Sequence, residues 1–263
     1  MMRQLVLIFL AVCLLISPVH AETDEESSLH RWKELNHTSD QVLQLVKAEK
    51  YEEAKQLLDY FSRNFLEVDF QAEGITMSAL RTVTLTFEKA EEAVTAADLP
   101  VEERIHAITS FRLAVDALTS EHHPLWLQTE QAVMQALTKM RETVVARDQQ
   151  AYQHRLNEFL RHYQMIRPAL FIHLEPPLLQ RIESQITFLE KRRTEPLEPD
   201  ALTAHLTMME EEWQKLYQQV KEDSADPSLW WVMFTIGGMI VLSLSYVGWK
   251  KYRAEKSKVR MKE

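Results

Sequence analysis

Apolar residues recur every three or four positions along most of the chain, which is the spacing that places them on one face of an α-helix. Between residues 22 and 228 there is one glycine, Gly74, and the prolines fall where helices are expected to start or stop. These prolines are Pro100, Pro124, Pro168, Pro176, Pro177, Pro196, Pro199 and Pro227. The pattern predicts an all-α fold, a multi-helix bundle of antiparallel helices.

Several apolar stripes have helical spacing. The clearest are Val101, Ile105, Ile108, Phe111, Val115 and Leu118; Leu178, Ile182, Ile186 and Leu189; and Leu202, Leu206, Met209, Trp213, Leu216 and Val220. Residues 82–86 are rich in threonine and resemble a strand, but helical spacing on both sides predicts a helix there. The stretch from Pro124 to Pro168 changes its apolar face around residues 147–150, which predicts a break or kink.

The N-terminal part of this region contains a recognisable helix pair. Residues 42–61 resemble the turn between the two helices of a tetratricopeptide repeat, with the small Ala54 allowing close approach. Repeat architectures need at least three recurrences, and no second copy follows at a period of 34 residues. We therefore expect one antiparallel helix pair, and the choice between a bundle and a solenoid stays open.

The first 21 residues have the layout of a secretory signal peptide. Arg3 precedes an unbroken apolar run, Leu5 to Ile16, which is too short to span a bilayer comfortably. Ser17 and Pro18 end the run, and small residues precede a cleavage site after Ala21. The mature chain would then contain no cysteine, because the one Cys lies in this segment.

A second apolar segment, residues 229–249, has the length and composition of a transmembrane helix. Aromatic residues gather at its two ends, as expected at a lipid–water interface. They are Trp230, Trp231, Tyr246, Trp249 and Tyr252. The basic tail, residues 250–263, follows directly, and Lys250, Lys251 and Arg253 are the cations nearest the span. Because positive flanks stay in the cytoplasm, we expect a single-pass cell-membrane protein with residues 22–228 outside and the C-terminus inside.

The charge of the chain narrows the choice of partners. The whole sequence has a formal net charge of -9, and residues 22–228 contain 22 basic and 37 acidic residues. An acidic surface disfavours nucleic acid, which binds through displaced counterions. The expected partners are the lipid bilayer and a protein of unknown identity, with no nucleic acid.

Candidate catalytic chemistry is sparse. His154, Glu158 and His162 share one helical face with zinc-type spacing, but that face points away from the apolar stripe and is expected to be solvated. Glu121, His122 and His123 are expected in a polar turn. There is no nucleophile elbow and no calcium loop. We expect no enzymatic activity, no catalytic residue, no metal and no cofactor.

The overall layout resembles the sporulation protein YpjB family of endospore-forming Bacillus-type bacteria. The resemblance covers nearly the whole chain and includes the block Ala114–Leu118 followed by Pro124-Leu125-Trp126. It implies a non-enzymatic membrane protein made during sporulation, and it supplies no site residues.

Three hypotheses about function follow. The leading one is a non-enzymatic membrane protein with an extracytoplasmic helical interaction domain that contributes to sporulation. A sensor or regulatory subunit that transmits an extracytoplasmic signal is the first alternative. A cell-envelope enzyme with a dispersed site is the second.

Overall fold

The computed structural model describes residues 22–120, 123–193, 199–223 and 227–259. Within these residues the chain forms helices and no strand, which confirms the all-α prediction. The elements are α2 (Glu22–Lys47), α3 (Tyr51–Leu66), α4 (Met77–Thr95), α5 (Val101–Ala117), the 3₁₀ helix η1 (Leu125–Thr129), α6 (Glu130–Val145), α7 (Gln149–His173), α8 (Pro176–Lys191), α9 (Pro199–Asp223) and α10 (Pro227–Val259). Residues 82–86 lie inside α4, so the threonine-rich run is helical as expected.

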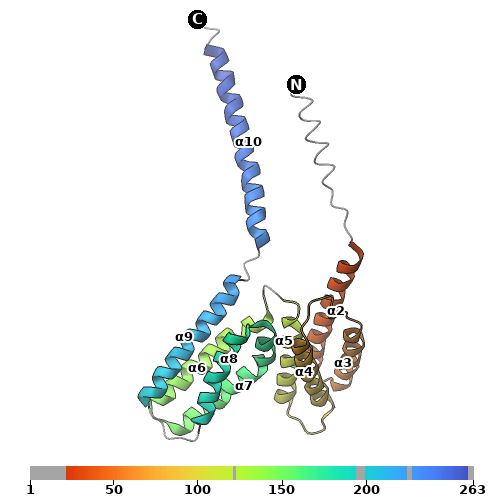
Figure 1. Ribbon diagram of the computed structural model, residues 1–263, viewed down its shortest axis with the longest axis vertical. Helices are drawn as coiled ribbons and strands as arrows, with labels where there is room; N and C mark the ends of the chain where they lie inside the picture. Colours follow the sequence, from red (N-terminus) through yellow and green to blue (C-terminus); the bar gives the residue numbers. More distant parts are fainter. Residues whose placement is uncertain (1–21, 121–122, 194–198, 224–226, 260–263) are drawn as a thin grey trace. The chain divides into compact units, whose positions relative to one another are not determined.

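The chain divides into two compact units, one up to Val115 and one from Asp116 onward. In unit 1, α2, α3, α4 and α5 lie side by side (Figure 1). Arg31 donates to the carbonyl of Glu67 at 3.1 Å and the Tyr60 hydroxyl donates to Glu34, so α2 and the chain through α3 run in opposite directions. The predicted antiparallel pair is therefore confirmed, and Ala54 is fully buried.

Aromatic side chains fill the centre of unit 1. The ring of Phe61 on α3 lies 5.4 Å from that of Phe65, 5.9 Å from that of Phe87 on α4 and 4.9 Å from that of Phe111 on α5. Offset and edge-to-face pairs at these distances stabilise a core beyond the area they bury. Phe61 thus joins three of the four helices of the unit.

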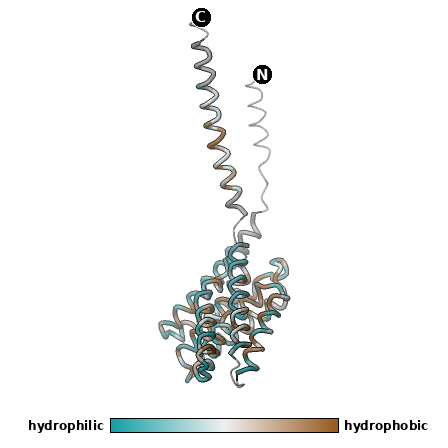
Figure 2. Tube along the Cα trace, turned by 90° about the vertical axis from the view of Figure 1, so that its left-hand side faces the viewer, coloured by the Kyte–Doolittle hydropathy of each residue, from teal (hydrophilic) through white to brown (hydrophobic). Residues whose placement is uncertain are grey.

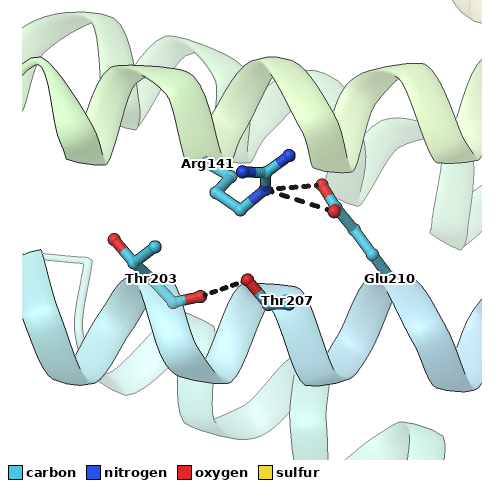
Figure 3. A network of polar contacts seen from close by, with 4 residues as sticks. All are labelled: Arg141, Thr203, Thr207 and Glu210. Atoms are coloured by element: carbon cyan, nitrogen blue, oxygen red, sulfur yellow. Dashed lines mark hydrogen bonds and ion pairs between the residues drawn. The ribbon is translucent and has the colours of Figure 1, made fainter.

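Unit 2 also contains four neighbouring helices, α6 to α9, and α6 packs against both α7 and α9. Arg141 on α6 donates through Nε to both carboxylate oxygens of Glu210 on α9, each at 3.2 Å (Figure 3). Lys221 pairs with Glu130 near the opposite ends of the same two helices, so α6 and α9 are antiparallel. Tyr163 on α7 donates to Glu183 on α8 at 2.8 Å.

The turn between α2 and α3 and the turn between α6 and α7 have the same backbone geometry. Glu49 and Arg147, which lie 98 residues apart, both have left-handed backbone, with φ of 58° and 56°. The next amide donates five residues back in both turns: Lys50 to Leu45 at 2.9 Å and Asp148 to Thr143 at 3.0 Å. This six-to-one bond is the Schellman motif, which ends a helix and reverses the chain.

The buried positions of the two units also match with this offset. At 98 residues' separation, Val42 pairs with Met140, Val46 with Val144, Leu58 with Leu156, Phe61 with Phe159 and Phe65 with Tyr163, and all ten are buried. The correspondence continues into the later helices, because α5 and α9 begin 98 residues apart and α4 and α8 begin 99 apart. The described chain therefore contains two sets of four helices whose buried positions correspond at an offset of 98 or 99 residues, which is far longer than the 34 residues searched in the sequence.

The long stretch after Pro124 is broken where its apolar face changes. α6 ends at Val145 and α7 begins at Gln149, which confirms the predicted break. The Asp148 side chain caps the new helix by accepting from the amide of Ala151 at 2.9 Å.

One proline prediction was wrong, because Pro168 lies inside α7 and not at its end. An interior proline costs a helix about 3 kcal/mol, since it removes one hydrogen bond and crowds the preceding turn. The carbonyl it leaves unpaired belongs to Gln164, which is exposed and can be solvated. The flanking Ile166 and Leu170 are fully buried, and their burial keeps the helix continuous.

The stripe predicted for α5 is confirmed at Ile108, Phe111 and Val115, which are fully buried, but its first apolar member is not buried. Val101 is 37% exposed, whereas Arg104 is only 4% exposed. The Arg104 guanidinium donates from Nε to the carbonyl of Leu99 at 2.9 Å, from Nη2 to that of Ala96 at 2.8 Å and from Nη1 to that of Ala93. It also lies 4.5 Å from the centre of the Tyr51 ring. Carbonyls at the negative end of α4 and an aromatic face therefore compensate this buried charge.

We expect Arg104→Ala to lower the free energy of unfolding by about 3 kcal/mol, because it leaves buried carbonyls without a donor. Arg104→Lys should recover only part of this loss, since an ammonium group cannot reproduce the planar fork. The exposed Arg81 on α4 provides a matched control, Arg81→Ala, with little expected effect. Chemical denaturation of the full chain in detergent, followed by circular dichroism, measures the differences. Equal midpoints for Arg104→Ala and Arg81→Ala would contradict a supporting role for the Arg104 guanidinium.

Candidate functional site

The apolar surface of α10 is the most conspicuous functional feature of the chain. Residues Trp231–Trp249 form a 19-residue segment long and apolar enough to cross a membrane, and none of it is buried. It is the one such helix within the described residues. Figure 2 shows hydrophobic residues in the central part of α10, whereas hydrophobic and hydrophilic residues alternate along the other helices. The 33 residues of α10 make a helix about 50 Å long, longer than the hydrocarbon core of a bilayer.

The predicted interface aromatics lie on this helix. Trp231 is 74% exposed, and Tyr246 and Trp249 are each 61% exposed. Trp230 and Tyr252 belong to α10, but their side chains lie outside the described part of the structure.

The predicted topology determinants follow on the same helix. Lys251 is exposed, while the side chains of Lys250 and Arg253 are outside the described part. The predicted signal peptide, residues 1–21 with its cleavage site at Ala21, also falls outside the described residues.

Residues 114–118 and 124–126, on which the family resemblance rests, lie at the end of α5 and the start of η1. Asp116 is 7% exposed, and its Oδ2 accepts from the backbone amide of Leu125 at 2.6 Å. Its Oδ1 accepts from the Ser120 hydroxyl at 2.8 Å. A carboxylate in this position satisfies an amide at the start of a helix that has no partner within the helix. The role of Asp116 is thus to fix the chain before Trp126.

Trp126 is fully buried, next to the C-terminal ends of α7 and α9. Its ring lies 6.0 Å from that of His173 on α7 and 5.3 Å from that of Tyr217 on α9. The Thr129 hydroxyl donates to the Trp126 carbonyl at 2.6 Å and lies 3.1 Å from the Tyr217 hydroxyl, which therefore donates to Thr129. Burial lowers the pKa of His173 and raises the pKa of Tyr217, so both side chains are neutral at pH 7.

On α7, the face that contains His154, Glu158 and His162 carries an ion pair instead, because Glu158 pairs with Arg155. His154 is exposed, and Arg155 donates to Glu158 at 2.7 Å, a hydrogen bond that lowers the pKa of Glu158. In the part of the chain that the structure describes, no three His, Cys, Asp or Glu side chains are grouped so that they could hold a metal ion. Glu121 and His122 of the predicted polar turn are outside the described residues.

A cleft of about 170 Å³ lies between α8 and α9. Gln185, Glu212 and Trp213 line it, and the exposed cations Arg181 and Lys215 stand on its two sides. The Gln185 amide donates to the Glu212 carboxylate. The cleft was not predicted from the sequence, although a glutamine between Ile182 and Leu189 on an apolar face was a signal that could have indicated it.

Comparison with known proteins places the whole layout in one family. The model of the family described as "Sporulation protein YpjB (SpoYpjB)" matches residues 32–261. The chain is 30% identical over 260 residues to "Uncharacterized protein YpjB" of Bacillus subtilis (strain 168), and the alignment covers 97% of each chain. No solved structure matches the chain. The matched region includes α10 and both four-helix units except the first ten residues of α2.

The depressed pKa of His173 predicts a loss of stability in mild acid. The unfolded chain takes up a proton at this residue as the pH falls through about 6.5, whereas the folded chain resists protonation. We therefore expect the free energy of unfolding to fall below pH 6.5, and His173→Phe, which keeps a ring against Trp126, to reduce that fall. Denaturation midpoints of the unmodified chain and of the variant, measured at pH 7.5 and at pH 5.5, give this loss of stability. The exposed His154 supplies the control, His154→Phe, and the prediction fails if the two variants show the same acid sensitivity.

Proposed function

The chain belongs to the sporulation protein YpjB family, as its resemblance predicted, and we propose that it is a single-pass membrane protein whose helical region binds a protein partner outside the cytoplasm during sporulation. The observation that carries this proposal is the unburied 19-residue apolar segment of α10. In water such an exposed apolar surface favours aggregation, whereas in a bilayer the lipid tails cover it.

The sequence around α10 supports one orientation. Seven Lys and Arg residues follow the span in residues 250–263, against two Glu. A basic flank of this kind stays in the cytoplasm, and the signal-like residues 1–21 would export the region between them. Residues 22–228 then lie outside the cytoplasm, and their acidic composition keeps them soluble there.

A binding role accounts for the polar chemistry of the helical units better than catalysis does. The groups with shifted pKa values have packing neighbours that explain the shifts: burial raises the pKa of Tyr152 to about 12 and lowers the pKa of His205. The His205 ring lies 4.1 Å from that of Phe188, between α8 and α9. Groups of this kind hold helices together, and we propose that the protein is not an enzyme and uses no cofactor.

A second candidate is a sensor or regulatory subunit that passes an extracytoplasmic signal inward. The observation that favours it is the continuity of α10, which extends as one helix from Pro227 to Val259, beyond the apolar segment into the basic tail. A rigid helix can transmit a displacement from one side of the bilayer to the other. This candidate places the working end of the protein in the cytoplasm.

Reporter fusions test the orientation. An enzyme that is active only outside the cytoplasm should be active when fused after Asp226 and inactive when fused after Glu263. Replacing Lys250, Lys251 and Arg253 by Gln should weaken the stop signal, so the C-terminal reporter gains activity. The matched triple variant, with Gln at Lys256, Lys258 and Arg260, should change it less because these cations are farther from the span. An active C-terminal reporter on the unmodified chain would overturn the proposed topology.

A further inference from the structure

The turn between α7 and α8 is unusually apolar for a connection at the surface. Residues 171–179 read FIHLEPPLL, and Glu175 is the only Asp, Glu, Lys or Arg among them. Phe171 is 43% exposed, Pro177 is exposed and Leu179 is partly exposed. Turns between helices usually carry polar residues because they face water. The prolines are in their ordinary place at the start of α8, but a helix start requires neither an exposed phenylalanine nor the leucines beside it.

This turn lies at the end of unit 2 from which the chain continues into α10. The Trp126 ring lies 6.0 Å from that of His173, the last residue of α7, and 5.3 Å from that of Tyr217 on α9. Tyr217 is fewer than two helical turns from the end of α9 at Asp223. The α7–α8 turn and the C-terminal end of α9 are therefore at the same end of the unit.

The covalent chain keeps this end of unit 2 close to the apolar segment of α10. Asp223 ends α9 and Pro227 begins α10, so the chain between them spans at most about 14 Å even when fully extended. The apolar segment begins at Trp231, about 6 Å further along the helix. It therefore starts within about 20 Å of the end of α9, whatever the angle between the two helices. If α10 spans a bilayer, the α7–α8 turn is within reach of the lipid headgroups.

The first turn of α8 directs its side chains toward this end. Each Cα–Cβ bond of an α-helix tilts toward the helix N-terminus, so Pro177 and Leu179 lean toward the end of the unit and away from its middle. Phenylalanine and leucine side chains lower their free energy at the boundary between headgroups and acyl chains. The carboxylate of Glu175, which is exposed in the same turn, can stay among the hydrated headgroups.

The opposite end of unit 2 has a different surface. Arg147 and Asp148 are exposed in the turn between α6 and α7, and Lys191 is exposed at the end of α8. Val145 is 62% exposed among these charged residues. Charged and apolar side chains are thus mixed at the end far from α10, whereas apolar side chains are grouped at the end near it.

We propose that the α7–α8 turn inserts into the headgroup region of the leaflet that faces unit 2, with Phe171, Pro177 and Leu179 at the boundary with the acyl chains. This inference rests on the proposed function, because it needs α10 to span the bilayer. It adds a second membrane contact, which holds unit 2 against the surface and makes this turn unavailable to a protein partner. Apolar burial drives the insertion, and the exposed Glu222 near the span means that anionic lipid is not required.

Spin labels test the proposal on the full chain in phosphatidylcholine vesicles. Cys13→Ser removes the one native cysteine, and Phe171→Cys or Pro177→Cys then provides a single labelling position in each sample. Electron paramagnetic resonance measures how often the label collides with oxygen, which concentrates in lipid, and with a nickel complex that stays in water. We expect the oxygen-to-nickel ratio at both positions to be several-fold higher than at Val145→Cys, an exposed apolar position at the opposite end of the unit.

A label at Leu242→Cys, a position that is 73% exposed on α10, separates failure of this inference from failure of the proposed function. If Leu242→Cys is in lipid while Phe171→Cys and Pro177→Cys are as open to nickel as Val145→Cys, the turn proposal is overturned and the proposed span stands. Low accessibility of the turn to both reagents would show that protein covers it, which also contradicts insertion into lipid. A label at Leu242→Cys that is open to nickel would overturn the proposed function, and this inference with it.

Discussion

The apolar surface of α10 is the constraint on which the rest of the structure depends. A segment with residues as exposed as Phe234, at 73%, is hydrated unfavourably in water, and under the proposed function lipid covers it. The helical units must then be stable from their own packing, without disulfides. They achieve this by burying aromatic and aliphatic stripes in two four-helix units, with hydrogen bonds at the turns and a few ion pairs such as Arg141–Glu210. Partly exposed pairs of this kind contribute little to stability, so the apolar cores supply most of it.

The elements that were predicted correctly from the sequence depend on periodicity. Helical spacing identified the all-α fold, and the change of apolar face around residues 147–150 located the break between α6 and α7. These predictions work because each amphipathic helix buries one stripe, and the burial of apolar surface is the largest favourable contribution to folding. For the same reason apolar residues on both sides of the break, such as Met140 and Phe159, are fully buried. The apolar length of α10 followed from composition alone.

The features that the sequence did not predict depend on tertiary neighbours. Pro168 usually marks a helix end, but burial on both sides of it keeps α7 intact. Arg104 looks like a surface residue until the carbonyls at the end of α4 surround it. The internal repeat was invisible because matching buried positions share only apolar character, and their volume changes freely, as from Ala54 to Tyr152. The cleft required both helices of unit 2 to be placed before Gln185 and Trp213 could be seen to share it.

The central claim is that α10 anchors helical units that fold without it. Alkaline extraction of membranes tests this most directly, because it releases peripheral proteins and retains those held by a hydrophobic span. We expect the full chain to stay in the membrane pellet, and a chain ending at Asp223 to be released with the helical circular dichroism of the intact units. Release of the full chain by alkali, or an unfolded truncated chain, would contradict the claim.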